Sequence, residues 1–180
     1  RHSWKTLASQ EPNRYPKELF TVLESTWVFN TVEWLDHYAK RDWTLTHMDY
    51  ELDNVLIDDD GPIVIDWQSP MISHPGVDLA WLLAASHTEE TLAVEEDFLK
   101  LYRDTLSSSG GPSWSAEDLE EALAWGILYP VSCQAVPYLQ DVSAYGAGAD
   151  RMHQRFEKFL QGSIDAAVRW NLVDHLQPLI

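Results

Sequence analysis

The sequence predicts a mainly α-helical domain that carries one small β-hairpin. Apolar residues recur at helical spacing over most of the 180 residues, and a pair of short β-branched runs interrupts them. Hydrophobic residues make up 45% of the chain and nine of them are tryptophans, which argues against intrinsic disorder. The length fits one domain or one lobe of a larger one.

The expected elements follow in chain order. Residues 1–16, with Pro12 and Pro16, are expected to form an irregular lead-in. Residues 17–40 place apolar side chains at helical spacing and predict one long amphipathic helix. The Ser/Gly/Pro segment 107–113 is the clearest break between predicted helices. Further helices are expected over 76–87, 92–106, 116–130 and 150–173.

The hairpin is expected from two short apolar runs, Asn54–Ile57 and Ile63–Ile65. Between them stand three aspartates, a glycine and a proline, which is strong turn chemistry. Three consecutive aspartates could also bind a metal, but this composition favours a solvated turn.

The chain is strongly acidic, with 12 Lys+Arg against 29 Asp+Glu and a formal net charge of −17. Nucleic acids and anionic membranes are bound through Lys and Arg, so neither is an expected partner. The single cysteine, Cys133, excludes an internal disulfide and a cysteine-based zinc site, and its apolar surroundings favour an inert, buried thiol over a nucleophile. Without a signal-peptide pattern, a cytoplasmic location is expected.

Polar residues gather where the helical period gives way to the hairpin. His47, Asp49 and Asn54 precede the first strand, and Asp66 ends the second. Because a hairpin brings its two ends together, Asn54 and Asp66 are expected side by side, with Asp49 on the adjoining loop. Carboxylate and amide oxygens suit a hard cation such as Mg²⁺, which is typically shared with substrate phosphates.

The stretch Thr46–Leu83 carries four motifs in order: His47-x-Asp49, Asn54-Val55-Leu56, Ile65-Asp66-Trp67-Gln68 and Asp78-Leu79-Ala80. This order resembles the protein-kinase-like small-molecule phosphotransferases, which include aminoglycoside phosphotransferases, choline kinases and ecdysteroid-kinase-like proteins. The resemblance implies that residues 17–180 form the C-terminal lobe of the kinase-like α+β fold. Within it, residues 46–67 would form the catalytic loop and hairpin, and 76–173 the helical remainder.

The resemblance also implies a role for each residue. Asp49 would be the catalytic residue that accepts or orients the proton of the attacking hydroxyl, and Asn54 and Asp66 would hold Mg²⁺ on the ATP phosphates. His47 and Asp78 would support the loop, Asp78 by accepting hydrogen bonds from its backbone. The implied reaction transfers the γ-phosphate of ATP to a hydroxyl of a small acceptor, such as an aminoglycoside or an amino alcohol.

Two features depart from the family pattern. Met48 stands where the family has glycine, which is tolerable if its φ angle is negative. Residues 1–45 contain neither a glycine-rich phosphate loop nor a strand lysine, so the ATP-binding N-lobe is expected to be missing and the chain to be inactive by itself. A catalytically silent binding module is therefore the alternative. A metal-dependent hydrolase using His47, Asp49 and Asp66 is less favoured, because the histidines are isolated.

The acid surplus bears only weakly on the acceptor. Two acidic clusters, in 89–97 and 117–121, would favour a cationic acceptor if they lined its pocket, but solvated helix faces are the favoured interpretation. Late aromatic residues could also line that pocket, although each is more often a core or surface residue: Trp125, Tyr129, Tyr138 and Tyr145. The sequence identifies neither the acceptor nor the oligomeric state.

Overall fold

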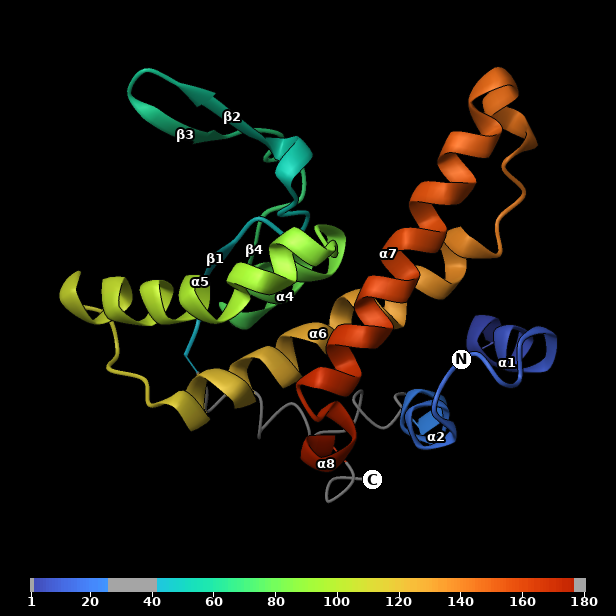
Figure 1. Ribbon diagram of the computed structural model, residues 1–180, viewed down its shortest axis with the longest axis horizontal. Helices are drawn as coiled ribbons and strands as arrows, with labels where there is room; N and C mark the ends of the chain where they lie inside the picture. Colours follow the sequence, from blue (N-terminus) through green and yellow to red (C-terminus); the bar gives the residue numbers. More distant parts are fainter. Residues whose placement is uncertain (1, 26–41, 177–180) are drawn as a thin grey trace.

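The computed structural model describes residues 2–25 and 42–176 and confirms a mainly α-helical architecture (Figure 1). Its centre is formed by α4 (Gly76–Ala85), α6 (Ala116–Tyr138) and α7 (Ala149–Arg169), which pack against one another. Helix α5 (Glu89–Ser108) follows α4, and α8 (Leu172–Leu176) closes the described part of the chain. No helix within these residues is long and apolar enough to span a membrane.

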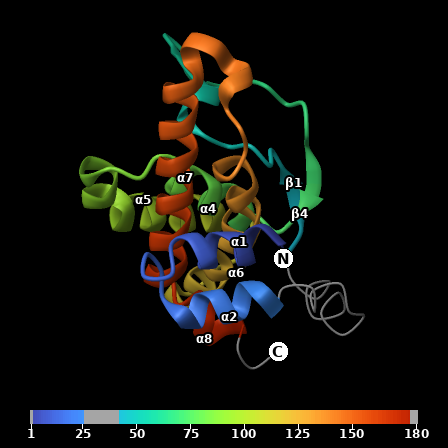
Figure 2. The ribbon, with the colours of Figure 1, turned by 90° about the vertical axis from the view of Figure 1, so that its right-hand side faces the viewer.

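The N-terminal region is helical, so the expectation of an irregular lead-in was wrong. Helix α1 (His2–Gln10) places Trp4 and Leu7 one turn apart on its buried side, and the Trp4 indole donates a hydrogen bond to the Ser132 carbonyl of α6 at 3.3 Å. Burial of these two side chains stabilises a helix that the polar composition alone does not indicate. Helix α2 (Lys17–Ser25) lies beside α1 (Figure 2) and confirms the start of the helix predicted over 17–40; residues 26–41 lie outside the described residues.

The predicted hairpin is present. Strands β2 (Val55–Asp58) and β3 (Gly61–Val64) pair in antiparallel register from Val55↔Val64 to Asp58↔Gly61. The Asp58 carboxylate accepts hydrogen bonds from the backbone N–H groups of Asp60 and Gly61, at 2.8 and 3.1 Å. Gly61 has a φ angle of 122°, a conformation that L side chains rarely adopt. The aspartates therefore form a turn, as their composition indicated.

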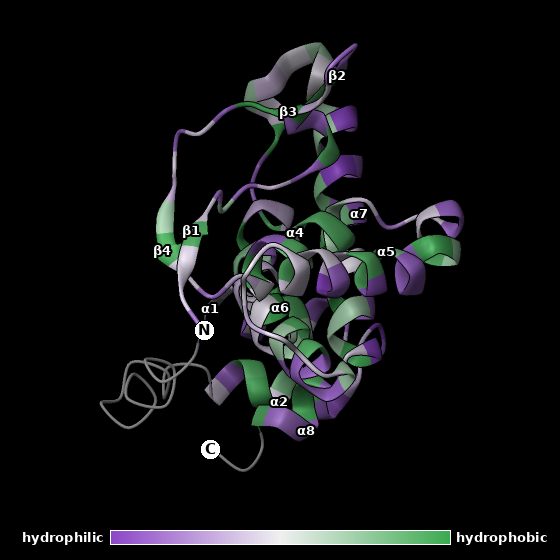
Figure 3. Cartoon of the chain, turned by 90° about the vertical axis from the view of Figure 1, so that its left-hand side faces the viewer, coloured by the Kyte–Doolittle hydropathy of each residue, from purple (hydrophilic) through white to green (hydrophobic). Residues whose placement is uncertain are grey.

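A second ribbon, β1 (Thr44–Thr46) with β4 (Met71–Ser73), was not predicted. Each strand has only three residues, and the β2–β3 hairpin lies between them in the chain. Their pairing therefore depends on how this intervening segment folds, and no local sequence pattern predicts it. The Thr46 hydroxyl donates to the Met71 carbonyl at 2.9 Å and joins the two strands. Parts of both two-stranded sheets are coloured as hydrophobic in Figure 3. Several of their apolar residues are exposed to solvent: Leu45, Leu56, Ile57, Ile63 and Ile72.

Two helix boundaries differ from prediction. Helix α6 continues through Pro130, where the sequence predicted its end, because the surrounding turns are buried between α1, α4 and α7 and this burial outweighs the roughly 3 kcal/mol that an internal proline costs. The last helix ends at Arg169 and restarts as α8, because Asn171 adopts a left-handed φ of 51°. Asparagine is one of the few residues that terminate helices in this way.

The backbone of α4 lies in direct contact with the backbones of α6 and α7. A Cβ atom placed on Gly126 of α6 would lie 1.9 Å from the Gly76 carbonyl oxygen, and one on Gly162 of α7 would lie 2.2 Å from the Ala84 carbonyl oxygen. Glycine at these positions therefore sets how closely α6 and α7 pack on α4. The position of α4 matters for the site, since α4 carries Asp78 in its first turn.

We expect Gly126→Ala to lower the free energy of unfolding by about 2 kcal/mol or more, because the new methyl group meets backbone that cannot yield without moving a helix. The loss is expected even though alanine is the better helix former by about 1 kcal/mol. Urea denaturation measures the change. Gly148→Ala is the control, since a Cβ there has no atom within 4 Å, and its effect should stay below about 1 kcal/mol. Equal effects of the two substitutions would contradict the close packing of α4.

Candidate active site

Asp49 lies on the turn between β1 and η2, a short 3₁₀ helix over Leu52–Asn54. Hydrogen bonds to helix α4 fix this turn. One oxygen of the Asp78 carboxylate accepts a hydrogen bond from the His47 backbone N–H at 2.7 Å, and the other accepts from the Met48 N–H at 2.9 Å. Asp78 lies in the first turn of α4, where the helix dipole favours a negative charge. The carboxylate thus fixes two consecutive backbone groups immediately before Asp49.

His47 fastens the same turn to the end of the hairpin. Its side chain is buried, and Nε2 lies 2.8 Å from the carbonyl oxygen of Ile65, the residue before Asp66. A carbonyl can only accept, so Nε2 carries the hydrogen. The Trp67 ring packs against the His47 ring edge-on, with centroids 4.7 Å apart.

Asn54 and Asp66 lie at the base of the hairpin, where the sequence placed them. The Ile65 N–H donates to the Asn54 carbonyl at 2.9 Å, which brings the residue before Asp66 against Asn54. The Asn54 side-chain amide donates to the Asp49 carbonyl at 2.8 Å, so it also braces the turn. Asp49 and Asn54 are half-buried and Asp66 is exposed. All three therefore gather at one end of the hairpin, within reach of a bound ligand.

The oxygen atoms at this position are of the kind that binds a hard cation such as Mg²⁺. With the Asn54 amide nitrogen turned to Asp49, its oxygen makes no hydrogen bond to another described residue, and neither does the Asp66 carboxylate. One amide oxygen and one carboxylate are ligands that Mg²⁺ accepts, with phosphate and water oxygens completing the shell. Nowhere in residues 2–25 and 42–176 do three or more His, Cys, Asp or Glu side chains form a self-sufficient metal site.

The loop is also tied to α7, which the sequence did not reveal. Arg155 of α7 forms an ion pair with Glu51 and lies 3.5 Å from the Asp53 carboxylate. Burial raises the pKa of Glu51, the Asp49 and Asp53 charges raise it further, and Arg155 offsets part of this rise. No sequence signal links Arg155 to Glu51, because their pairing depends on where α7 crosses the loop.

The late aromatic residues divide into three groups. Trp125 is buried in the core, and Tyr138 donates a hydrogen bond to Glu11 at 2.6 Å. Tyr129 of α6 is 42% exposed and packs on Trp81. Burial, the neighbouring Cys133 and the Asp49 charge raise the pKa of Tyr129, so its ring lies within electrostatic reach of Asp49. Tyr145 lines a cleft that opens beside the loop.

Cys133 is partly buried, and this burial raises the pKa of its thiol, with the Tyr129 hydroxyl lowering it in part. A raised pKa leaves little thiolate near neutral pH, which agrees with an inert thiol.

Two carboxylates of the acidic clusters have structural partners. Glu95 is buried and accepts two hydrogen bonds from Arg169, at 2.8 and 2.9 Å, and one from the Trp170 indole at 3.2 Å. Asp118 forms a capping box with Ser115 at the start of α6. These two carboxylates therefore stabilise a buried contact and a helix start, as the structural interpretation of the clusters predicts.

A comparison with protein-family models matches residues 2–119 to the phosphotransferase enzyme family. The match spans well over half of the chain and includes the turn with Asp49, the hairpin and Asp78, so the chain belongs to this family. It agrees with the resemblance to aminoglycoside phosphotransferases and related kinases. No curated protein sequence and no solved structure gives a significant match.

Met48 occupies a conformation that explains the glycine of the family pattern. Its φ angle is 69°, in the left-handed region, so the negative φ that would make a side chain harmless is not found. The Met48 side chain is nonetheless buried, at 7% exposure. Burial of its apolar surface offsets the backbone strain, which is of the order of 1–2 kcal/mol for a residue with a Cβ.

We expect Met48→Gly to be about 1 kcal/mol more stable than Met48→Ala, because both variants lose the buried side chain and only alanine keeps the strained φ. Urea denaturation of the two variants measures the difference. The same pair at Met71 is the control, since β4 is extended there and glycine should be the less stable of the two. If Met48→Ala and Met48→Gly have equal free energies of unfolding, the inferred backbone strain at position 48 is wrong.

The raised pKa of Glu51 predicts a pH dependence of stability. A carboxyl whose pKa is higher in the folded than in the unfolded protein stabilises the fold at low pH and loses this contribution as pH rises through the folded pKa. Glu51→Gln should therefore become more stable relative to the unsubstituted protein as pH rises from about 4 to about 7. Chemical denaturation at several pH values tests this.

Glu11→Gln serves as the control with the opposite sign. Burial alone would raise the pKa of Glu11, but hydrogen bonds from Arg14 and Tyr138 hold it below its ordinary value. Its contribution is present above the unfolded pKa and is lost as pH falls, so Glu11→Gln should become less stable relative to the parent protein as pH rises. Parallel pH profiles for the two variants would rule out the assigned cause at Glu51.

Proposed function

We propose that the protein is an ATP- and Mg²⁺-dependent kinase that phosphorylates a hydroxyl group of a small molecule. The observation that carries this proposal is the convergence of Asp49, Asn54 and Asp66 at one end of a hairpin, on a turn fixed by Asp78. Membership of the phosphotransferase enzyme family supports the reaction class. The acceptor and the activity itself are part of the proposal.

Each residue has a defined task in this reaction. The acceptor hydroxyl oxygen attacks the γ-phosphorus, its proton passes to the Asp49 carboxylate, and the bond to the β–γ bridging oxygen breaks so that ADP leaves with the electron pair. Asn54 and Asp66 would hold Mg²⁺, which supplies positive charge to the phosphate oxygens during transfer. His47 and Asp78 do not touch the reacting atoms and act by holding the turn on which Asp49 lies.

We propose ATP and a small acceptor as the binding partners, with neither nucleic acid nor membrane involved. The reaction would take place in the cytoplasm, where ATP is available and the Cys133 thiol stays reduced. Tyr129 would form part of the acceptor's surroundings, since its ring is half-exposed and within electrostatic reach of Asp49.

In the gene product that carries this sequence, Asp49→Ala and Asp66→Ala should each abolish transfer of phosphate from ATP. The measurement is ADP release with a panel of hydroxyl acceptors, alongside circular dichroism to show that the fold persists. Asp59→Ala is the control, because Asp59 lies exposed in the hairpin turn, and it should keep the parent rate. Full turnover by Asp49→Ala or Asp66→Ala would overturn the assignment. A parent protein that binds small molecules but never releases ADP would favour a silent binding module.

A further inference from the structure

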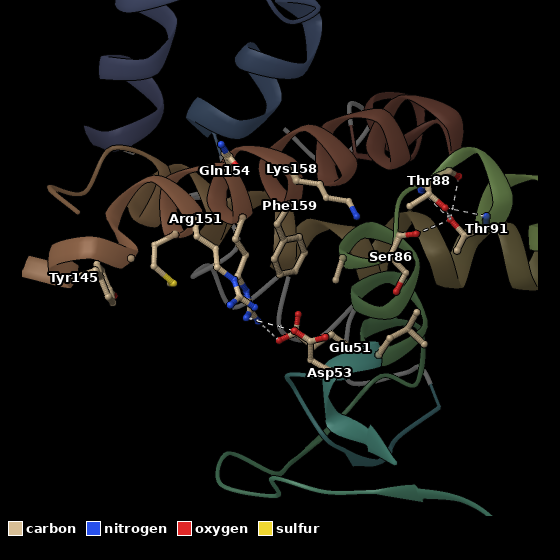
Figure 4. A pocket seen from close by; sticks show the side chains of 15 residues that line it. Glu51, Asp53, Ser86, Thr88, Thr91, Tyr145, Arg151, Gln154, Lys158 and Phe159 are labelled. Carbon is tan, nitrogen blue, oxygen red and sulfur yellow. Dashed lines mark hydrogen bonds and ion pairs between the residues drawn. The ribbon is translucent and has the colours of Figure 1, made fainter. Parts of the chain in front are cut away.

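A cleft of about 840 Å³ opens beside the catalytic loop (Figure 4). Glu51, Leu52 and Asp53 form its floor, the segment joining α4 to α5 forms one wall, and α7 forms the other. Tyr145 of η3 (Ser143–Gly148) lies at one end. The floor begins two residues after Asp49, and the Asp49 charge acts on Glu51, so the proposed catalytic carboxylate lies close to the cleft although it does not line it.

The α7 wall carries three cations at helical spacing. Arg151, Arg155 and Lys158 lie at positions i, i+4 and i+7, which places them on one face of the helix. Further along α7 the residues that pack on its neighbours are apolar or small, from Phe159 to Ala167. The helix therefore changes from a packing face to a cationic face at the point where it leaves the core and borders the cleft.

Two of the three cations are available to a ligand. Arg155 is engaged by Glu51 and Asp53, whereas Arg151 and Lys158 make no hydrogen bond or ion pair with another residue in the described part of the chain. Both side chains extend from α7 into the cleft in Figure 4, and Lys158 reaches toward the wall that carries Ser86 and Thr88. Glu90 of α5 lies within electrostatic reach of Lys158 but does not line the cleft.

This arrangement is unusual for the chain as a whole. Only 12 of its 180 residues are Lys or Arg, and three of them line this cleft. A net charge of −17 repels anions at a distance, but salt screens that repulsion beyond about 8 Å, so nearby side chains decide what binds. The cations also lie beyond residue 119, where the family match ends, so membership of the family does not account for them.

We propose that the acceptor carries an anionic carboxylate or phosphate group, which binds Arg151 and Lys158 while its hydroxyl group faces Asp49. This inference rests on the proposed kinase function and names the acceptor's chemical class. An arginine offers paired donors to a carboxylate or phosphate, and a lysine adds a point charge. The Glu51 and Asp53 carboxylates pair with Arg155, so neither occupies Arg151 or Lys158 in place of the anion. The proposed acceptor is thus opposite in charge to the cationic acceptor that the acidic clusters would favour if they lined its pocket.

Binding can be measured without relying on catalysis. Three probes share one carbon skeleton and differ in charge: glycerate, glycerol and 3-amino-1,2-propanediol. The methyl group of Met152 lines the cleft, and the chain has only two other methionines, Met48 and Met71. With ¹³C-methyl methionine in the gene product, glycerate should shift the Met152 signal, which Met152→Leu identifies, and leave Met71 of β4 in place.

The matched variants are Arg151→Gln/Lys158→Gln and Lys100→Gln/Arg103→Gln. The second pair removes the same charge from α5 residues that line a separate groove. The first pair should weaken glycerate binding about tenfold and the second by less than about twofold, as expected for losing contact charges against distant, screened ones. Circular dichroism confirms that both variants fold.

The two proposals fail in different ways. If the cationic probe shifts Met152 as strongly as glycerate does, or if both variant pairs weaken glycerate equally, the anionic acceptor is wrong whatever the enzyme does. If glycerate binds through Arg151 and Lys158 but no hydroxy acid or phosphorylated alcohol is ever phosphorylated, the anion site stands and the kinase function fails. Phosphorylation of amino alcohols alone, with no binding of glycerate, would retain the kinase and overturn this inference.

Discussion

Two hydrogen bonds from consecutive backbone N–H groups to the Asp78 carboxylate determine where Asp49 lies. Both donors belong to the turn, and the acceptor belongs to the first turn of α4, so the turn follows the helix. Helix α4 is in turn seated on α6 and α7 at glycine contacts that admit no side chain. The close packing of these three helices therefore determines the position of the proposed catalytic carboxylate. Loss of the Asp78 carboxylate would leave two buried N–H groups without acceptors. The free-energy cost of these unpaired donors would exceed the net stabilisation that the two hydrogen bonds provide.

The other attachments of the turn complete this constraint. His47 reaches the Ile65 carbonyl, and Asn54 reaches the Asp49 carbonyl, so the turn and the hairpin base hold each other. The cost is visible in the backbone, where Met48 and Asp66 both have φ angles above 60°. Strained residues of this kind persist when the surrounding bonds over-determine them, and they concentrate at functional sites. Here one strained residue, Met48, precedes Asp49, and the other is Asp66, which the proposed reaction uses.

Charge is distributed more locally than the net value suggests. Glu95 is buried against Arg169 and Trp170, Asp118 caps α6 and Asp58 closes the hairpin turn. These carboxylates have structural partners, so their number says little about a ligand. The cleft beside Asp49 has the opposite character on its α7 wall, because Arg151 and Lys158 line it and form no hydrogen bond or ion pair with another described residue. The positions of a few nearby charges therefore matter more for ligand binding than the net charge of the chain, because each charge acts strongly only at short range.

Local sequence determined the features whose cause is local. Turn chemistry predicted the hairpin, and through it the meeting of Asn54 with Asp66 near Asp49; Ser115 and Asp118 marked the start of α6. Tertiary structure decided the rest, because burial against distant residues overrides weak local preferences. It made a helix of residues 2–10, carried α6 through Pro130 and joined β1 to β4. It also brought the α7 cations to the loop, since the partners of Arg155 lie about a hundred residues earlier in the chain and only the crossing of α7 unites them.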